Sequence, residues 1–253
     1  MAMKENVYRL YPNLGYWLML FIPLVFTGFY FTYFTKLDFS PTMIHAHFIL
    51  MGIWMGMMII QPLLIRYRQV RLHRSLGRLS YFLVPVLILV TYWVLKNGYA
   101  TQITSLESDL AQGIAPYTEA EGRIVIAAYH ALAFTYIFWL IVFYGLAIAF
   151  RKQSSIHARF MIAAALTFMG PTLDRTLFFW FGLETLGFGI PVETLAFVIN
   201  DLIILILLLQ DLRKGKKSWP LLIALGLYLT VQIGYFTLTK TPAWEQFVNF
   251  ILN

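Results

Sequence analysis

The sequence predicts an all-α integral membrane protein in which about seven helices cross the bilayer. Its 253 residues are 60% hydrophobic and only 12% charged. The apolar residues are gathered in runs of roughly 20 or more, the length that a helix needs to cross the hydrocarbon core. The alternating pattern of a membrane β-barrel is absent. Helices are then the spanning structure that satisfies the backbone hydrogen bonds.

The predicted spans are, in chain order, residues 14–34, 43–65, 78–96, 123–150, 158–183, 193–212 and 219–239. Pro41 and Pro191 precede the second and sixth spans, where proline suits the start of a helix. Gly52 and Gly56 form a small-xxx-small pair that predicts close helix packing. The longest connection, residues 97–122, is too short for a core of its own. We therefore expect one integral-membrane domain over residues 1–253, with the histidines on the core helices, 43–212.

Basic residues fall in alternate connections between these spans. The three connections hold Arg66, Arg68, Arg71, Arg74 and Arg78, then Arg151, Lys152 and Arg159, then Arg213, Lys214, Lys216 and Lys217. Since positive charge marks cytoplasmic loops, the pattern predicts a cytoplasmic N-terminus and a C-terminus outside. The acidic connection that carries Glu107, Asp109, Glu119 and Glu121 would then face outward.

Composition also excludes several classes of partner and chemistry. The net charge of +7 is explained by topology and by contact with membrane lipids, so nucleic acid is not expected as a partner. The absence of cysteine excludes disulfides, thiolate metal sites and thiol catalysis. No cleavable signal pattern is visible, so residues 14–34 are expected to remain as a span. We expect the bacterial inner membrane as the location.

Three of the five histidines are predicted near the outer side of the membrane. His45 and His47 begin the second span, and His130 lies about two turns into the fourth. Ionisable residues inside a bilayer mark a functional site by default, and imidazole is a common ligand of metals and heme iron. A further polar group is predicted at similar depth: Asp174, Arg175, Asn200 and Asp201.

Residues two apart on a helix point about 200° apart, so His45 and His47 cannot both bind one ion from a regular helix. The segment His45-Ala46-His47-Phe48 resembles the HxH-aromatic helix of heme-copper oxidases, in which opposite faces meet different hemes. This resemblance implies separate partners for the two histidines.

The other two histidines lie at the inner ends of the third and fifth spans. They occur in the motifs HR-x-LGR, from His73 to Arg78, and H-x-R-aromatic-Met, from His157 to Met161. Together these motifs resemble an uncharacterised family of predicted membrane proteins of bacteria and fungi, over residues 43–175. Ile162 stands where that family has a basic residue. The resemblance implies no established activity.

Histidines on the second to fifth spans also resemble, in helix order, the transmembrane diheme cytochromes b that pass electrons from ascorbate. This implies an outer heme on the second and fourth spans, bound by His45 or His47 with His130. An inner heme on the third and fifth spans would be bound by His73 and His157. Paired hydrogen bonds to the heme propionates would come from arginines: Arg66, Arg71, Arg74, Arg78 and Arg159.

Three functional hypotheses follow from these residues. The first is a redox protein that carries electrons through bis-histidine heme b, with a quinol or another donor. The second is an outward-facing zinc or iron membrane enzyme. It would use His45, His47, His130, Asp174 and Asp201, although the paired HxxxH of the adiponectin-receptor type of zinc hydrolase is absent. The third is a proton-coupled transporter or an assembly factor with a carboxylate and histidine path. The catalytic residues and the oligomeric state stay open.

Overall fold

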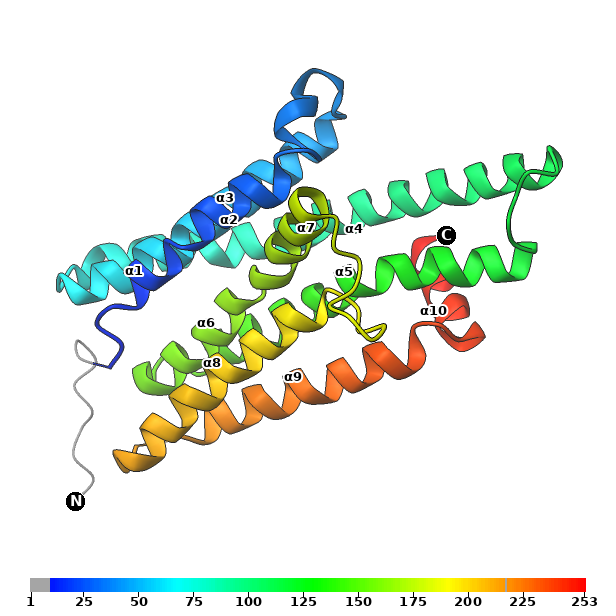
Figure 1. The fold of residues 1–253 in the computed structure, drawn as a ribbon. Helices are drawn as coiled ribbons and strands as arrows, with labels where there is room; N and C mark the ends of the chain where they lie inside the picture. Colours follow the sequence, from blue (N-terminus) through cyan, green and yellow to red (C-terminus); the bar gives the residue numbers. More distant parts are fainter. Residues whose placement is uncertain (1–9, 217) are drawn as a thin grey trace.

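The computed structural model describes residues 10–216 and 218–253. The long helices run roughly along one axis, and the short α10 lies across it (Figure 1). In chain order they are α1 (Leu14–Leu18), α2 (Phe21–Phe29), the short 3-10 helix η2 (Phe34–Phe39), α3 (Thr42–Arg66), α4 (Val70–Ala111), α5 (Glu119–Ala149), α6 (Ser154–Leu166), α7 (Met169–Phe181), α8 (Thr194–Arg213), α9 (Trp219–Leu238) and α10 (Pro242–Leu252).

Six helices of the described chain are long and apolar enough to cross a membrane. They are Thr42–Arg66, Val70–Ala111, Glu119–Ala149, Ser154–Phe181, Glu193–Arg213 and Trp219–Leu238. The all-α class is therefore confirmed, with six helices in the described chain that could span a membrane. The fourth of these spans comprises α6 and α7, which meet at Thr167 and Phe168.

The first predicted span, residues 14–34, is shorter and interrupted. The apolar helical segment runs only from Leu14 to Phe29, and α1 ends before α2 begins at Phe21. Because Pro23 has no amide hydrogen, the carbonyl of Met19 lacks its usual helical donor, which favours a break at this point. The segment still follows α3 along its length. Asn13 accepts from Arg66 at the end of α3, and Tyr33 bonds His45 at its start.

Helix α4 is much longer than the predicted span 78–96. It has 42 residues, about 63 Å at 1.5 Å per residue. Most of the predicted connection 97–122 is therefore helical, with α4 ending at Ala111 and α5 beginning at Glu119. Gln102 and Glu107 belong to residue types that favour helix as well as polar surroundings. Thr118 and Glu121 start α5 with a capping box, which satisfies its first amide groups.

The α4–α5 hairpin projects beyond the other helices (Figure 1). Helix α10, which the sequence did not predict, packs on its flank. Trp244 of α10 donates to the carbonyl of Ala127 in α5. Tyr99 of α4 donates to Asn249 of α10.

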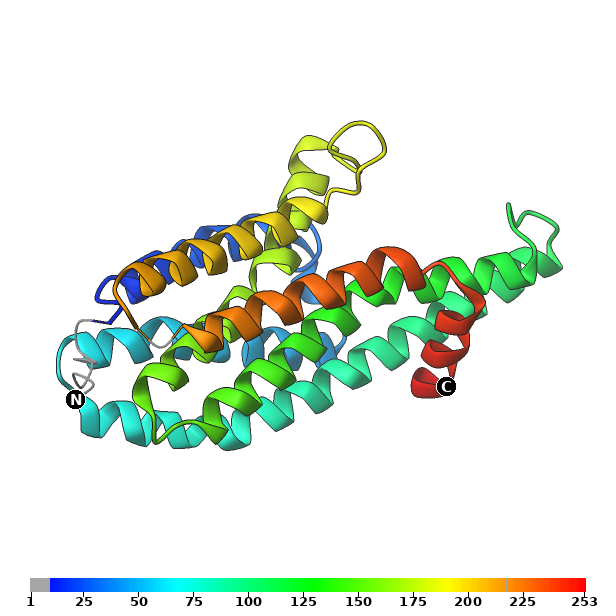
Figure 2. The same ribbon diagram turned by 90° about the horizontal axis from the view of Figure 1, so that it is seen from below.

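The three basic connections lie together at one end of the bundle (Figure 2). They join α3 to α4, α5 to α6 and α8 to α9, and we call this the basic end. The acidic turn between α4 and α5 lies at the opposite end (Figure 2). The basic and acidic segments that alternate along the sequence therefore lie at opposite ends of the folded molecule.

Helix α6 and its continuation α7 form the most buried of the six spans. Small residues make this possible, since Ala163, Ala164 and Ala165 are almost fully buried. An aromatic core around Trp139 and Tyr228 packs on one side of α6. A second core around Trp54 and Leu87 packs on the other side.

Candidate functional site

His73 and His157 face each other at the basic end. Their ring centroids are 6.4 Å apart and the ring planes cross at 83°. Each is the fourth residue of its helix, α4 or α6. Both helices start at the basic end, because α5 separates them and runs in the opposite direction (Figure 1). The two histidines therefore reach the same level although they are far apart in the sequence.

Not all ring nitrogens of this pair form hydrogen bonds with other protein groups. His157 Nδ1 lies 2.8 Å from the carbonyl oxygen of Ala147. A carbonyl only accepts, so Nδ1 carries the hydrogen and Nε2 of the neutral ring keeps a lone pair. His73 Nδ1 is buried and has no partner among the described residues. His73 also makes a hydrogen bond with the backbone of Gln61, so Nδ1 is the ring nitrogen that is left for a further partner.

The spacing agrees with two imidazoles on opposite sides of one metal ion. A nitrogen ligand lies about 2.0–2.1 Å from such an ion, which places opposing ring centroids roughly 6.3 Å apart. A metal-bound histidine commonly donates its other ring nitrogen to a backbone carbonyl, as His157 does to Ala147. The separation of the two rings is therefore compatible with two axial ligands of one heme iron.

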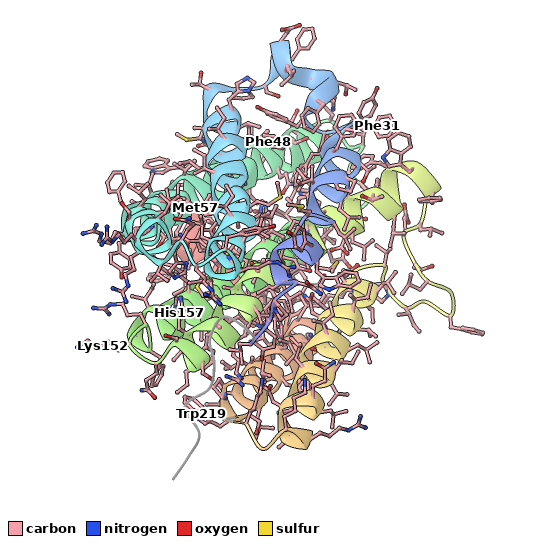
Figure 3. The ribbon with its side chains drawn as sticks, turned by 90° about the vertical axis from the view of Figure 1, so that its left-hand side faces the viewer. Phe31, Phe48, Met57, Lys152, His157 and Trp219 are labelled. Carbon is pink, nitrogen blue, oxygen red and sulfur yellow. The ribbon has the colours of Figure 1, made fainter. Side chains whose placement is uncertain are left out.

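The basic end of the bundle, with His157 and Lys152, faces the viewer in Figure 3. His157 lies inside the bundle in that view, whereas Lys152 lies at its rim. Arg71, Arg74 and Arg78 are exposed on the first turns of α4, within five residues of His73 in the sequence. Arg66 is also exposed, but it donates to the carbonyl of Pro12 at 2.6 Å.

Arg159 does not have the role that the sequence suggested. Its side chain is fully buried, and Nε donates to Asp211 Oδ2 at 2.6 Å. Tyr11 donates to the same carboxylate oxygen at 3.1 Å. Arg159 is therefore held by protein groups and is not presented to a heme propionate. Asp211 was not predicted from the sequence as the partner of Arg159. An acidic residue in the last turn of an apolar helix is a signal for a buried ion pair.

The outer heme site is not assembled. His47 Nδ1 meets Thr91 Oγ1 at 3.2 Å, and His130 Nε2 meets Gln102 Oε1 at 2.9 Å. The His130 ring also lies beside Gly98, which is seven residues after Thr91 on α4, about 10 Å along the helix. Since α4 and α5 extend farther than predicted, His130 lies in the projecting hairpin, away from the start of α3. His45 bonds Tyr33 at 2.9 Å.

The metal-enzyme ligand set is not assembled either. Within residues 10–216 and 218–253, no group of three or more histidine, aspartate or glutamate side chains could hold a metal ion. Asp201 accepts a hydrogen bond from Gln232 at 3.1 Å, while Asp174 has no hydrogen-bond partner in the described chain. The predicted ligands His45, His47, His130, Asp174 and Asp201 thus do not converge.

Comparison of the chain with protein-family models, with curated proteins and with solved structures gave no match. The assignment of the His73–His157 pair therefore depends on its geometry.

Proposed function

We propose that this protein is a membrane electron carrier that binds one heme b between His73 and His157. The observation that carries the proposal is the 6.4 Å separation of the two rings, together with the unpartnered buried nitrogen of His73. Bound heme would supply one-electron redox chemistry, and two histidine ligands suit a carrier because both axial positions are filled.

The residues around the pair have defined roles in this proposal. The Ala147 carbonyl orients His157 by accepting from Nδ1, which leaves Nε2 for the iron. Arg71, Arg74 and Arg78, exposed near His73, offer guanidinium groups to the heme propionates. The buried ion pair of Arg159 and Asp211 holds α6 to α8 beside the site.

The proposed electron donor is a quinol that reaches the protein through the lipid. An apolar hollow of about 330 Å³ lies between α3 and α4, lined by Leu50, Ile53, Met57, Leu76, Leu79, Phe82, Leu83 and Val86. Leu76 is one turn from His73, and Leu79 and Phe82 are exposed. An apolar surface of this kind suits the hydrocarbon part of a membrane-soluble donor.

The proposal places the basic end in the cytoplasm, as in a bacterial inner membrane protein. The three basic connections at that end support this orientation. Helices α1 and α2 would provide a seventh crossing, because this segment follows α3 from Arg66 to His45. The N-terminus would then be cytoplasmic and the C-terminus outside.

The first test is an absorption spectrum of the detergent-purified protein, oxidised and dithionite-reduced, with heme quantified per chain. We expect the sharp reduced bands of a low-spin b-type cytochrome and one heme per chain. His73→Ala and His157→Ala should each lose nearly all of the heme, since one axial ligand is removed.

His45→Ala and His130→Ala are the matched controls, and both should keep the heme. Size-exclusion profiles of all four variants check that each remains folded. A heme-free wild type after expression with ample heme would overturn the proposal. Full heme content in folded His73→Ala or His157→Ala protein would do the same.

A further inference from the structure

Helix α7 carries a carboxyl group into the interior, at the other end of the bundle from the histidine pair. Asp174 is only 8% exposed, and neither carboxyl oxygen has a hydrogen-bond partner among the described residues. The adjacent Arg175 is an electrostatic neighbour of Asp174 but makes no hydrogen bond to its carboxyl group. Arg175 Nη1 donates to the carbonyl of Pro171 at 3.0 Å, and the guanidinium lies 5.1 Å from the ring centroid of Phe29.

Tyr136 of α5 is an electrostatic neighbour of Asp174. Its hydroxyl group is buried and has no partner in the described chain. It lies directly against Gly170, where a Cβ atom would overlap the phenol. Gly170 is one helical turn before Asp174 on α7, so the phenol hydroxyl and the carboxyl group line the same stretch of this helix.

Two further ionisable groups near Asp174 lie closer to the surface. Glu193, at the start of α8, is an electrostatic neighbour of Asp174 and is only half-buried. Tyr235 of α9 donates to Glu193 Oε1 at 2.7 Å and is also an electrostatic neighbour of Asp174. Helix α2 packs against α7 but has no titratable side chain. Among the described residues, the ionisable groups that interact electrostatically with Asp174 are Tyr136, Arg175, Glu193 and Tyr235.

Burial without hydrogen bonds favours binding of a proton, rather than a metal ion, by the Asp174 carboxyl group. An ionised carboxylate buried without hydrogen bonds or a paired cation is so costly that the group takes up a proton instead. A metal ion would need several converging ligands, and the described residues offer no group of three acids or histidines.

We propose that Asp174 is a proton-binding site that exchanges protons with the surface through Glu193. A proton leaves the Glu193 carboxyl group and binds a carboxyl oxygen of Asp174, and Glu193 then takes a proton from water. The same transfers in reverse order remove the proton from Asp174. Tyr235 orients Glu193 through its hydrogen bond, and Tyr136 keeps a hydroxyl group beside the path. The proposal does not depend on heme binding.

Infrared spectroscopy of the full-length protein in lipid vesicles tests this directly. At neutral pH we expect the carbonyl band of a protonated carboxylic acid, which shifts to lower frequency in D₂O. Asp174→Asn should remove the band. Asp38→Asn is the matched control, because Asp38 is an exposed carboxylate at the same end of the bundle, and it should leave the band unchanged.

Glu193→Gln tests the route. It should keep the Asp174 band at equilibrium but slow its hydrogen–deuterium exchange severalfold. If Asp174→Asn fails to fold, carbon-13 labelling of aspartate shows whether the band belongs to an aspartate, and the same labelling in Asp38→Asn, Asp109→Asn and Asp201→Asn excludes the aspartates outside the Arg159–Asp211 ion pair. The proposal is overturned if the wild type has no such band at neutral pH, or if the band belongs to another residue. Unchanged exchange in Glu193→Gln would remove Glu193 from the route.

Discussion

Arg159 illustrates how this protein accommodates a full charge in its interior. The guanidinium is completely buried and is paired with Asp211, whose side chain is 4% exposed. The Ser155 carbonyl accepts from Nη1 at 2.8 Å, so the cation has several partners. A buried pair of this kind contributes little compared with apolar packing, but it becomes very costly when one partner is lost.

We therefore expect Asp211→Asn to lower the free energy of unfolding by about 3–5 kcal/mol. The substitution leaves Arg159 charged and without its carboxylate. Thermal unfolding in one detergent measures the change, with Glu184→Gln as a control at an exposed acid. The double variant Arg159→Met/Asp211→Leu should recover most of the loss. Equal unfolding midpoints for Asp211→Asn and Glu184→Gln would contradict this expectation.

Arg159 also shows why the partner of a residue cannot be predicted from its neighbours in the sequence alone. The H-x-R motif places Arg159 two residues after His157, and this proximity suggested a propionate contact. In the folded chain the partner is 52 positions away. Nothing in the local sequence distinguishes these partners, because an arginine binds either carboxylate with the same geometry.

At the scale of elements, the contact between α2 and α7 depends on Gly28. A Cβ atom at Gly28 would overlap the backbone carbonyl of Thr172. The two helices also share a hydrogen bond between the hydroxyl groups of Thr27 and Thr176, at 3.0 Å. Gly52 and Gly56, in contrast, have no atom within 4 Å of an added Cβ in the described structure. The close helix packing predicted at Gly52 and Gly56 is therefore not found in the described structure.

Gly28→Ala should destabilise the protein by about 1–3 kcal/mol, since the backbone of α7 must move to admit the methyl group. Gly56→Ala is the matched control and should be neutral or slightly stabilising, because alanine favours helix. Thermal unfolding midpoints of the two variants give the comparison. A loss of stability confined to Gly56→Ala would show that the α3 surface, rather than the α2–α7 contact, is the tight one.

The lengths of α4 and α5 decide which histidines can meet. Hydropathy identifies only the part of a helix that is apolar enough for the hydrocarbon core. The third span was therefore predicted to end near residue 96. The helix continues to Ala111 because its polar residues also favour helix. This extension separates His130 from His47 and leaves His73–His157 as the pair that the fold brings together.

At the scale of the whole molecule, the basic and acidic ends predict a single orientation. The chain has no cysteine, so single cysteines can report the side of the membrane without background. Lys152→Cys at the basic end should react with an impermeant thiol reagent only from the cytoplasmic side. Ala111→Cys, next to the acidic turn, should react only from outside.

The unchanged cysteine-free protein is the control for background labelling. Asp38→Cys, before α3, should behave like Ala111→Cys, because both positions lie away from the basic end. Labelling of Lys152→Cys and Ala111→Cys from the same side would refute the orientation and the number of crossings between them.

The sequence by itself determined the class of this protein, the positions of six spans and the asymmetry of charge. These properties follow from local composition, because each apolar run must avoid water and each basic connection must remain in it. Only the tertiary structure decided that His73 meets His157, that His47 and His130 stay apart, and that Arg159 is paired with Asp211. Such contacts depend on helix length, rotation and packing, which arise from many residues distant in the sequence.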